Sequence, residues 1–275
     1  MAAMVVRMIW FGVRRRLAAT FSPGGGSIDT IESGTTFAGR TIGGGTRKQV
    51  YGNRRYGSGY TYGGGNSSVA GRGFPFGYWP NFIPIARMGL EYYGNEEYGP
   101  ANNESRPGGV MQYAVIRSSE WPPENTTAPA NNKTASYYIV GDADSVSAVM
   151  GSLVTDCLVT NTTGQAIDNN DPAVHDEQAV QYYRASSFML ALSSYNNTAN
   201  LASNASPDDN KPPPTLDTPL PPGTDRVFLT CLNGTIGNAL PIIDAESAAA
   251  GTLQAAASLN AVGLLWLFVW LLKLF

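Results

Sequence analysis

The stretch Ser136–Leu158, SYYIVGDADSVSAVMGSLVTDCL, decides the expected fold because it changes from a strand pattern to a helix pattern. Ser136–Val140 is rich in aromatic and β-branched residues, which predicts a buried strand. After Asp144, which can cap a helix, apolar residues recur at the three-and-four spacing of an amphipathic helix. Cys157 lies on the apolar face of that helix. A strand followed at once by a core-facing helix indicates a domain of mixed α and β structure.

The other elements of this domain lie on both sides of that stretch, within residues 109–244. The same patterns predict strands at Met111–Arg117 and Ser187–Leu192, a short helix at Asp176–Tyr183, and a last helix that begins after Thr224 or Asp225. The order strand, strand, helix, helix, strand, helix indicates the α+β class. We expect a small antiparallel sheet with helices on one face.

Cys157 and Cys231 are the two cysteines of the chain, and each falls on the apolar face of a predicted helix. In an oxidising compartment they would form one disulfide that joins the two helices. In the cytosol they would be buried free thiols. The glycosylation signals of the chain favour the disulfide.

Eight Asn-X-Ser/Thr sequons occur in the sequence, whereas chance predicts about three for this composition. Their asparagines are Asn66, Asn103, Asn125, Asn132, Asn161, Asn196, Asn204 and Asn233. Such an excess is typical of a glycoprotein of the secretory pathway. The alternative is polar low-complexity sequence in which sequons arise by accident.

Residues 23–108 form a segment rich in Gly, Tyr and Arg, which we call the arm. Of the 31 glycines, 23 lie at or before Gly109, and residues 1–90 carry eleven basic and two acidic side chains. Residues 91–275 carry seven basic and nineteen acidic ones. Because no continuous apolar face runs through the arm, we expect it to be largely disordered. In detail, residues 1–50 should lack stable packing, and residues 51–108 should form at most loops laid over the domain.

Residues 245–275 are predicted to be a spacer and a membrane tail. Ala261–Phe275 holds a single charge, Lys273, and the eleven-residue spacer Ala250–Asn260 separates this tail from a small-residue triplet that begins at Ser247. This arrangement matches a GPI-anchor signal, with Ser247 as the attachment candidate. A retained transmembrane helix is the alternative, since Leu253–Leu272 is long enough to span and a terminal lysine can reach the interface. A helix buried in a core is a third and less favoured interpretation.

Residues 1–22 do not follow the usual order of a signal peptide. Arg7 interrupts the first apolar residues, and Arg14–Arg16 follows them, whereas a signal peptide places its charges first. We therefore expect a misassigned start site, which misses or garbles the true secretory leader. The alternative is a cytosolic chain whose sequons carry no meaning.

Motifs for catalysis are weak. His175 is the single histidine and is expected to be a solvated residue before the short helix, although nearby carboxylates would allow a base or a metal ligand. Asp168–Asp171 resembles a calcium loop but lacks its glycine and its distal glutamate. We predict no catalytic residue, no cofactor site and no metal site.

Several strings resemble a group of uncharacterised, secreted fungal glycine-rich and tyrosine-rich proteins with two cysteines. They are Gly39–Arg47, Tyr51–Tyr60, Gly71–Trp79, Glu97–Gly99, Ser105–Gly109, Gln181–Ser187 and Cys231–Gly237. The resemblance covers most of residues 37–240. It implies a leader peptide, a low-complexity arm, a two-cysteine domain and a hydrophobic C-terminal tail, and it implies no activity.

Together these features predict a non-enzymatic glycoprotein of the cell surface or cell wall, anchored through its C-terminus. Its expected partners are the membrane and, through the rings of the arm, wall or matrix polymers or its own domain. No nucleic-acid partner is expected. One alternative is that the basic arm stacks on and neutralises single-stranded nucleic acid. The other is an enzyme that uses carboxylates of the domain.

Overall fold

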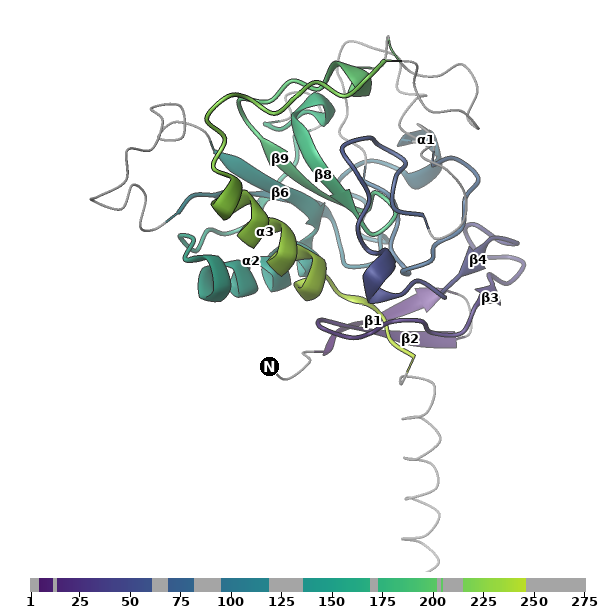
Figure 1. The fold of residues 1–275 in the computed structure, drawn as a ribbon. Coiled ribbons are helices and arrows are strands. Elements are labelled where there is room, and N and C mark those ends of the chain that lie inside the picture. Colours follow the sequence, from purple (N-terminus) through teal and green to yellow (C-terminus); the bar gives the residue numbers. More distant parts are fainter. Residues whose placement is uncertain are drawn as a thin grey trace, which may run out of the picture.

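Figure 1 shows the computed structural model of the chain, which describes residues 5–11, 14–60, 69–81, 95–118, 136–168, 173–201, 204 and 215–245. Its central element is a five-stranded sheet in the order β7, β5, β6, β9, β8, in which every neighbouring pair is antiparallel. These strands are β5 (Met111–Ile116), β6 (Tyr137–Asp142), β7 (Gln165–Ala166), β8 (Ala179–Tyr183) and β9 (Phe188–Leu192). The predicted class of mixed α and β structure with a small antiparallel sheet is confirmed.

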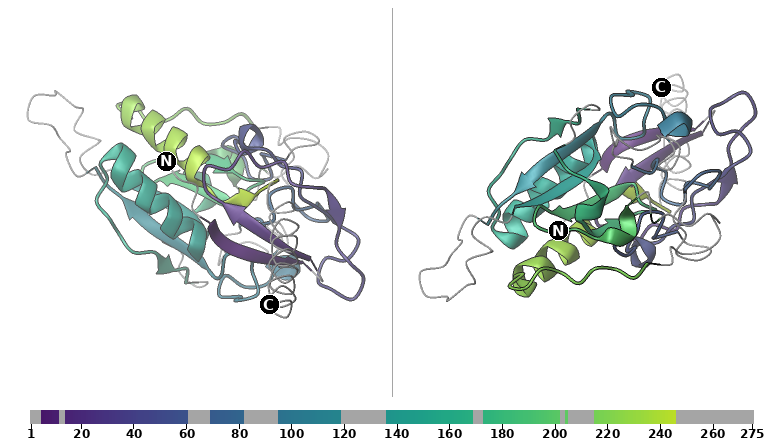
Figure 2. Two further views of the ribbon diagram at one scale, coloured as in Figure 1. Left: turned by 90° about the horizontal axis from the view of Figure 1, so that it is seen from below. Right: turned by 90° about the horizontal axis from the view of Figure 1, so that it is seen from above.

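Helices α2 (Ala143–Cys157) and α3 (Arg226–Ala239) lie side by side over one face of this sheet (Figures 1 and 2). Their apolar stripes and the facing strand residues form the first of two hydrophobic cores, the helix-side core. Its fully buried members include Ala114, Ile116, Ile139, Val149, Leu153, Leu190, Leu232 and Ile236. The sequence pattern had placed both helices correctly on this face.

Each helix begins at an aspartate, as expected, but the first aspartate is not the predicted one. The Asp142 carboxylate accepts a hydrogen bond from the Ser145 amide at 3.0 Å, so α2 is capped by Asp142 and not by Asp144. At α3, Asp225 accepts hydrogen bonds from the amides of Val227 and Phe228. Of the two caps considered there, Asp225 is the one used.

The short helix predicted at Asp176–Tyr183 is wrong, because most of this segment is strand β8. Only η4 (Asp176–Gln178) is helical, and it is a single 3₁₀ turn. The pairing of β8 with β9 slips between Ala179 and Gln181, which is a β-bulge. The bulge turns both Val180 and Tyr183 toward the helix-side core, and this spacing imitates the face of a helix.

The arm and the N-terminal segment form further strands and turns. They contain β1 (Val5–Phe11), β2 (Arg14–Ala19), β3 (Asp29–Thr30), β4 (Thr41–Ile42), η1 (Arg47–Gln49) and α1 (Asn95–Tyr98). β2 pairs with β1 on one side and with β10 (Ile242–Ile243) on the other, so this small sheet joins the two ends of the described chain (Figure 2). Outside this region, the 3₁₀ turn η5 (Thr198–Asn200) lies in the loop after β9.

The arm covers the face of the central sheet that α2 and α3 leave open, and a second hydrophobic core, the arm-side core, lies between them. From the arm it buries Ile31, Ile42, Tyr56, Phe74, Tyr78, Trp79 and Tyr98. From the sheet it buries Met111, Val140, Tyr182, Met189 and Ala191. The described residues of the arm are therefore packed, so the prediction of a largely disordered arm, and of no stable packing in residues 1–50, is wrong for them. Between residues 51 and 108 the described chain forms loops laid over the sheet, as predicted, apart from the short helix α1.

Two glycines show why the composition of the arm misleads. Gly43 has φ +96°, and a Cβ there would overlap the carbonyl oxygen of Ser27. Gly108 has φ +89°, and a Cβ there would overlap the carboxylate of Asp142. Both allow close backbone approach in conformations that other residues rarely adopt. At these two positions glycine thus allows the arm to pack closely against a backbone carbonyl and a carboxylate.

We predict that Gly43→Ala lowers the free energy of unfolding by about 2 kcal/mol or more, since it adds a clash to an unfavourable φ. Gly151→Ala is the matched control, because no atom lies within 4 Å of a Cβ at Gly151 in α2. That control should raise stability by about 0.5–1 kcal/mol. Urea unfolding of the two variants measures both effects, and equal stabilisation by both would contradict the packing described for the arm.

Candidate functional site

Arg184, in the turn between β8 and β9, is the most highly connected polar side chain described here, and its side chain is 0 % exposed. Its guanidinium donates to the Asp142 carboxylate at 2.6 Å, to the Ser145 hydroxyl at 2.9 Å and to the Pro241 carbonyl at 2.7 Å. Its Nε donates to the hydroxyl of Ser187 at 2.7 Å. These contacts bind the hairpin to the start of α2 and to the segment after α3.

The arm closes over the same guanidinium. The ring centre of Tyr78 lies 3.4 Å from the Arg184 guanidinium carbon, a close cation–π contact. Asn81 adds two further hydrogen bonds between the arm and the sheet region. Its side-chain amide donates to the Val140 carbonyl at 2.9 Å, and its backbone amide donates to the Ser186 carbonyl at 2.7 Å. Arg184 therefore lies where the arm, the sheet and α2 meet.

The turn that carries Arg184 is held in an unfavourable backbone conformation. Arg184, Ala185 and Ser186 have φ values of 51°, 52° and 59°, all in the left-handed region. Each such residue costs about 1–2 kcal/mol when it is not glycine. Contacts to the arm offset this strain, since the Ser186 hydroxyl donates to the Ser58 carbonyl at 3.1 Å. The turn and the arm thus stabilise each other.

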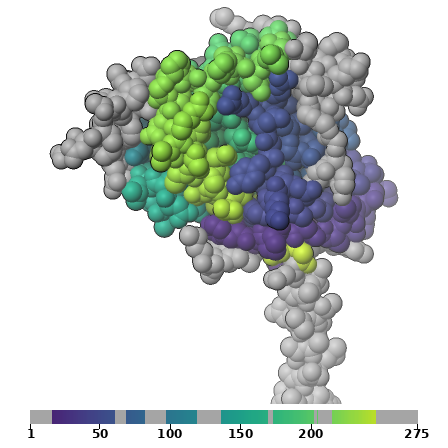
Figure 3. All heavy atoms as spheres, viewed as in Figure 1, coloured from purple at the N-terminus to yellow at the C-terminus, as the bar shows by residue number. Residues whose placement is uncertain are grey.

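Two further arginines of the arm, the half-buried Arg47 and the buried Arg106, donate to backbone carbonyls. Arg47 donates to the carbonyls of Gly237 at 3.0 Å and Leu240 at 2.6 Å, at the C-terminal end of α3, where a positive charge is favourable. Arg106 donates to the Pro80 carbonyl at 2.8 Å. Burial lowers the pKa of each guanidinium to about 10, so both stay charged at neutral pH. Figure 3 shows arm residues lying against α3 at the surface.

Asp176 is the one described carboxylic acid whose pKa is clearly raised. It is 1 % exposed, and the Tyr182 hydroxyl donates to its Oδ1 at 2.6 Å. Among the described residues, its Oδ2 has no hydrogen-bond partner. Burial raises the pKa of this carboxyl to about 7, although the hydrogen bond from Tyr182 acts in the opposite direction. The neighbouring His175, expected to be solvated, is half-buried and precedes η4.

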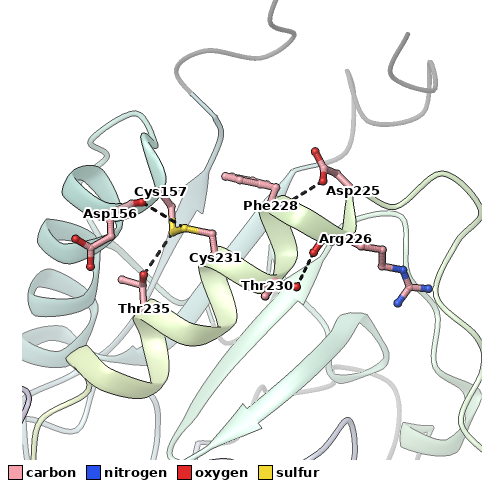
Figure 4. The surroundings of a disulfide bond; sticks show 8 residues. All are labelled: Asp156, Cys157, Asp225, Arg226, Phe228, Thr230, Cys231 and Thr235. Carbon is pink, nitrogen blue, oxygen red and sulfur yellow. Dashed lines mark hydrogen bonds between the residues drawn. A yellow bond between two sulfur atoms is a disulfide. The ribbon is translucent and has the colours of Figure 1, made fainter. Parts of the chain in front are cut away.

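The predicted disulfide between Cys157 and Cys231 is confirmed (Figure 4). Their Cα atoms are 5.8 Å apart, and the bond joins the last residue of α2 to the middle of α3. Cys157 is buried and Cys231 half-buried. The Thr235 hydroxyl of α3 lies 3.4 Å from the Cys157 sulfur, so α3 also contacts the bond through this side chain.

The sequon asparagines differ in accessibility. Asn161 and Asn196 are exposed, whereas Asn103, Asn204 and Asn233 are half-buried. The Asn233 side-chain oxygen accepts a hydrogen bond from the Tyr183 hydroxyl at 2.7 Å. Several predicted positions lie outside the described residues, namely Asn66, Asn125, Asn132, Ser247 and the tail from Leu253 to Phe275.

Within the described ranges, no three His, Cys, Asp or Glu side chains are grouped so that they could hold a metal ion. Over those same ranges, none of the helices has the length and apolar character needed to cross a membrane. The comparisons with protein-family models, curated proteins and solved structures found no match. The resemblance to secreted fungal glycine-rich proteins therefore stays a prediction.

Sequence reasoning found the disulfide but missed the buried polar groups. The string Gln181–Ser187, which contains Arg184, was noted for its resemblance alone, with no role for its arginine. No local sequence pattern marks this arginine as buried. Its partner Asp142 is 42 positions away, and no local pattern connects the two.

We predict that Arg184→Met lowers the free energy of unfolding by about 3–5 kcal/mol, because it leaves the Asp142 carboxylate buried without its cation. Arg117→Met is the matched control, since Arg117 is exposed, and it should change stability by less than about 0.5 kcal/mol. If Arg184→Met does not fold, Asp142→Asn gives a milder test, because asparagine still caps a helix. Chemical unfolding that shows equal stability of the Arg184 and Arg117 variants would refute the role given to Arg184.

Proposed function

We propose that this protein is a non-enzymatic glycoprotein of the cell surface or cell wall, which enters the secretory pathway and is held to the membrane by its C-terminal tail. The observation that carries the proposal is the disulfide between Cys157 and Cys231. Disulfides persist in oxidising compartments and are rare in the cytosol. A bond that joins the two principal helices is a structural use of cysteine, as in many secreted domains.

Exposed sequons support the same compartment. Asn161 and Asn196 lie in loops and are open to solvent, so each has room for a glycan on the folded protein. Asn233 differs, because it lies within α3, its side chain is bonded to Tyr183, and the Thr235 of its sequon is buried. The structure thus divides the sequons into favourable and unfavourable positions, which makes the proposal testable site by site.

The contacts of the arm's arginines favour an intramolecular role over nucleic-acid binding. Seven arginines between residues 16 and 106 are buried or half-buried. They are Arg16, Arg40, Arg47, Arg54, Arg55, Arg72 and Arg106. Three of them form ion pairs within the chain, Arg16 with Asp29, Arg40 with Glu97 and Arg55 with Asp217. A protein that neutralises phosphates needs its cations at the surface.

The membrane attachment in this proposal rests on the sequence of residues 245–275. The small-residue triplet at Ser247, the spacer and the apolar tail together match a GPI signal, and we favour that anchor over a retained transmembrane helix. The domain would then be displayed outside the cell. The packed arm would present part of its surface to wall or matrix polymers.

Glycan mapping on protein isolated from its native source tests the proposal. We expect peptide mass spectrometry to find glycans on Asn161 and Asn196, together with the Cys157–Cys231 cross-link under non-reducing conditions. Asn161→Gln and Asn196→Gln should each remove one glycan and increase gel mobility, because each deletes an accessible acceptor. Asn233→Gln is the matched control and should leave the mobility unchanged.

Two results would contradict the proposal. Native protein that carries no glycan and has two free thiols would place the chain outside the secretory pathway. Binding of single-stranded nucleic acid with a steep salt dependence would support the alternative function instead. Release from membranes by a phosphatidylinositol-specific phospholipase separates a lipid anchor from a retained helix, since only the former is cleaved.

A further inference from the structure

Asp176 lies at a junction between three separate segments of the chain. Its backbone carbonyl accepts a hydrogen bond from the side-chain amide of Asn200 in η5, at 3.0 Å. The same amide donates to the Arg54 carbonyl in the arm, at 2.7 Å. The side chain of Asp176 reaches Tyr182 in β8. One buried acid is thus connected to η5, to the arm and to the sheet.

Backbone hydrogen bonds complete this junction. The Asn197 amide donates to the Glu177 carbonyl at 2.6 Å, which connects η5 to η4. The Gly52 amide donates to the Tyr182 carbonyl at 2.9 Å, which connects the arm to the edge strand β8. These two contacts join the same segments that the side chains of Asp176 and Asn200 connect.

Nearby charges offer little support for an ionised Asp176. The groups that influence its carboxyl are the Tyr182 hydroxyl, Glu177 beside it in η4, and Tyr56 in the arm. The Glu177 carboxylate disfavours a second negative charge beside it, and Tyr56 is a neutral phenol, because burial raises its pKa well above the ordinary value. The cations of this region are engaged elsewhere, because Arg55 pairs with Asp217 and the Arg54 guanidinium lies over the Tyr195 ring.

We propose that Asp176 is a proton-dependent latch, which in its protonated form holds η4 and η5 against the arm and which loosens when it ionises. An ionised Asp176 has the Tyr182 hydroxyl as its hydrogen-bond donor, and its Oδ2 lies unpartnered in the protein interior. Opening the junction lets water reach that oxygen. The charged acid therefore favours the open junction, and the neutral acid favours the closed one.

The pH window follows from the two states of the acid. In the open junction Asp176 has its ordinary pKa of 3.8, and in the closed junction burial raises this pKa to about 7. The ratio of closed to open junction is therefore highest below pH ~4. It falls by up to about tenfold per pH unit as the pH rises toward 7. Above pH ~7 both states are ionised, and the equilibrium no longer changes with pH.

Amide hydrogen exchange between pH 4.5 and 8.5 tests the latch, with rates expressed as protection factors to remove the intrinsic effect of pH. At Gly52, Gln178 and Asn197 we expect protection to fall by at least tenfold from pH 5 to pH 7 and then to level off. Amides paired between β5 and β6 report on opening of the whole domain and should stay more protected than the junction amides at every pH. A flat profile at the three junction amides would overturn the proposal.

Three variants assign the effect to this one acid. Asp176→Asn cannot ionise and should abolish the change in protection. Glu177→Gln, the matched control, should keep it. Tyr182→Phe removes the hydrogen bond that favours the charged form, so the level region should begin at a higher pH. Retention of the full pH dependence in Asp176→Asn would refute the latch even if every variant folds.

Discussion

The ion pair between Arg184 and Asp142 is the contact on which the other parts of this structure depend. The carboxylate that caps α2 also receives the guanidinium of the β8–β9 turn, so one aspartate fixes both a helix start and a hairpin. Two charges so deeply buried are favourable only if their remaining hydrogen-bonding groups are satisfied. Ser145, Ser187 and the Pro241 carbonyl supply those partners. Substitution of any one of these residues should therefore destabilise several elements at once.

The arm shows how a glycine-rich segment can become part of a core. Its aromatic rings supply much of the packed apolar surface. The ring centre of Phe37, for example, lies 5.0–5.4 Å from the ring centres of Phe74, Trp79 and Tyr98. Its glycines allow close approach of the backbone, and its arginines donate to backbone carbonyls of the arm and of neighbouring segments. Arg47, bound to the end of α3, is the clearest case. Because these contacts lie far apart in the sequence, the arm and the domain are expected to unfold together.

The sequence predicted those features that follow from local periodicity. Strands β5 and β9, both helices and the disulfide all come from patterns that persist over a whole element. The sequence failed where tertiary contacts decide the outcome. The bulge in β8 gave Val180 and Tyr183 a helical spacing, and composition alone suggested disorder where Phe74 and Tyr98 are in fact buried. Neither the burial of Arg184 nor the raised pKa of Asp176 has a local signature, because each depends on residues brought together only by the fold.

Native-state hydrogen exchange tests most directly the central claim, that the arm and the sheet form one cooperative unit. The amides of Phe74 and Asn81, which donate to Thr41 and Ser186, report on the arm, and amides paired between β6 and β9 report on the sheet. The account predicts that both sets open with the same free energy, within about 1 kcal/mol. If the arm amides open several kcal/mol more easily than the sheet amides, the arm is an independent layer and the central role given to Arg184 is wrong.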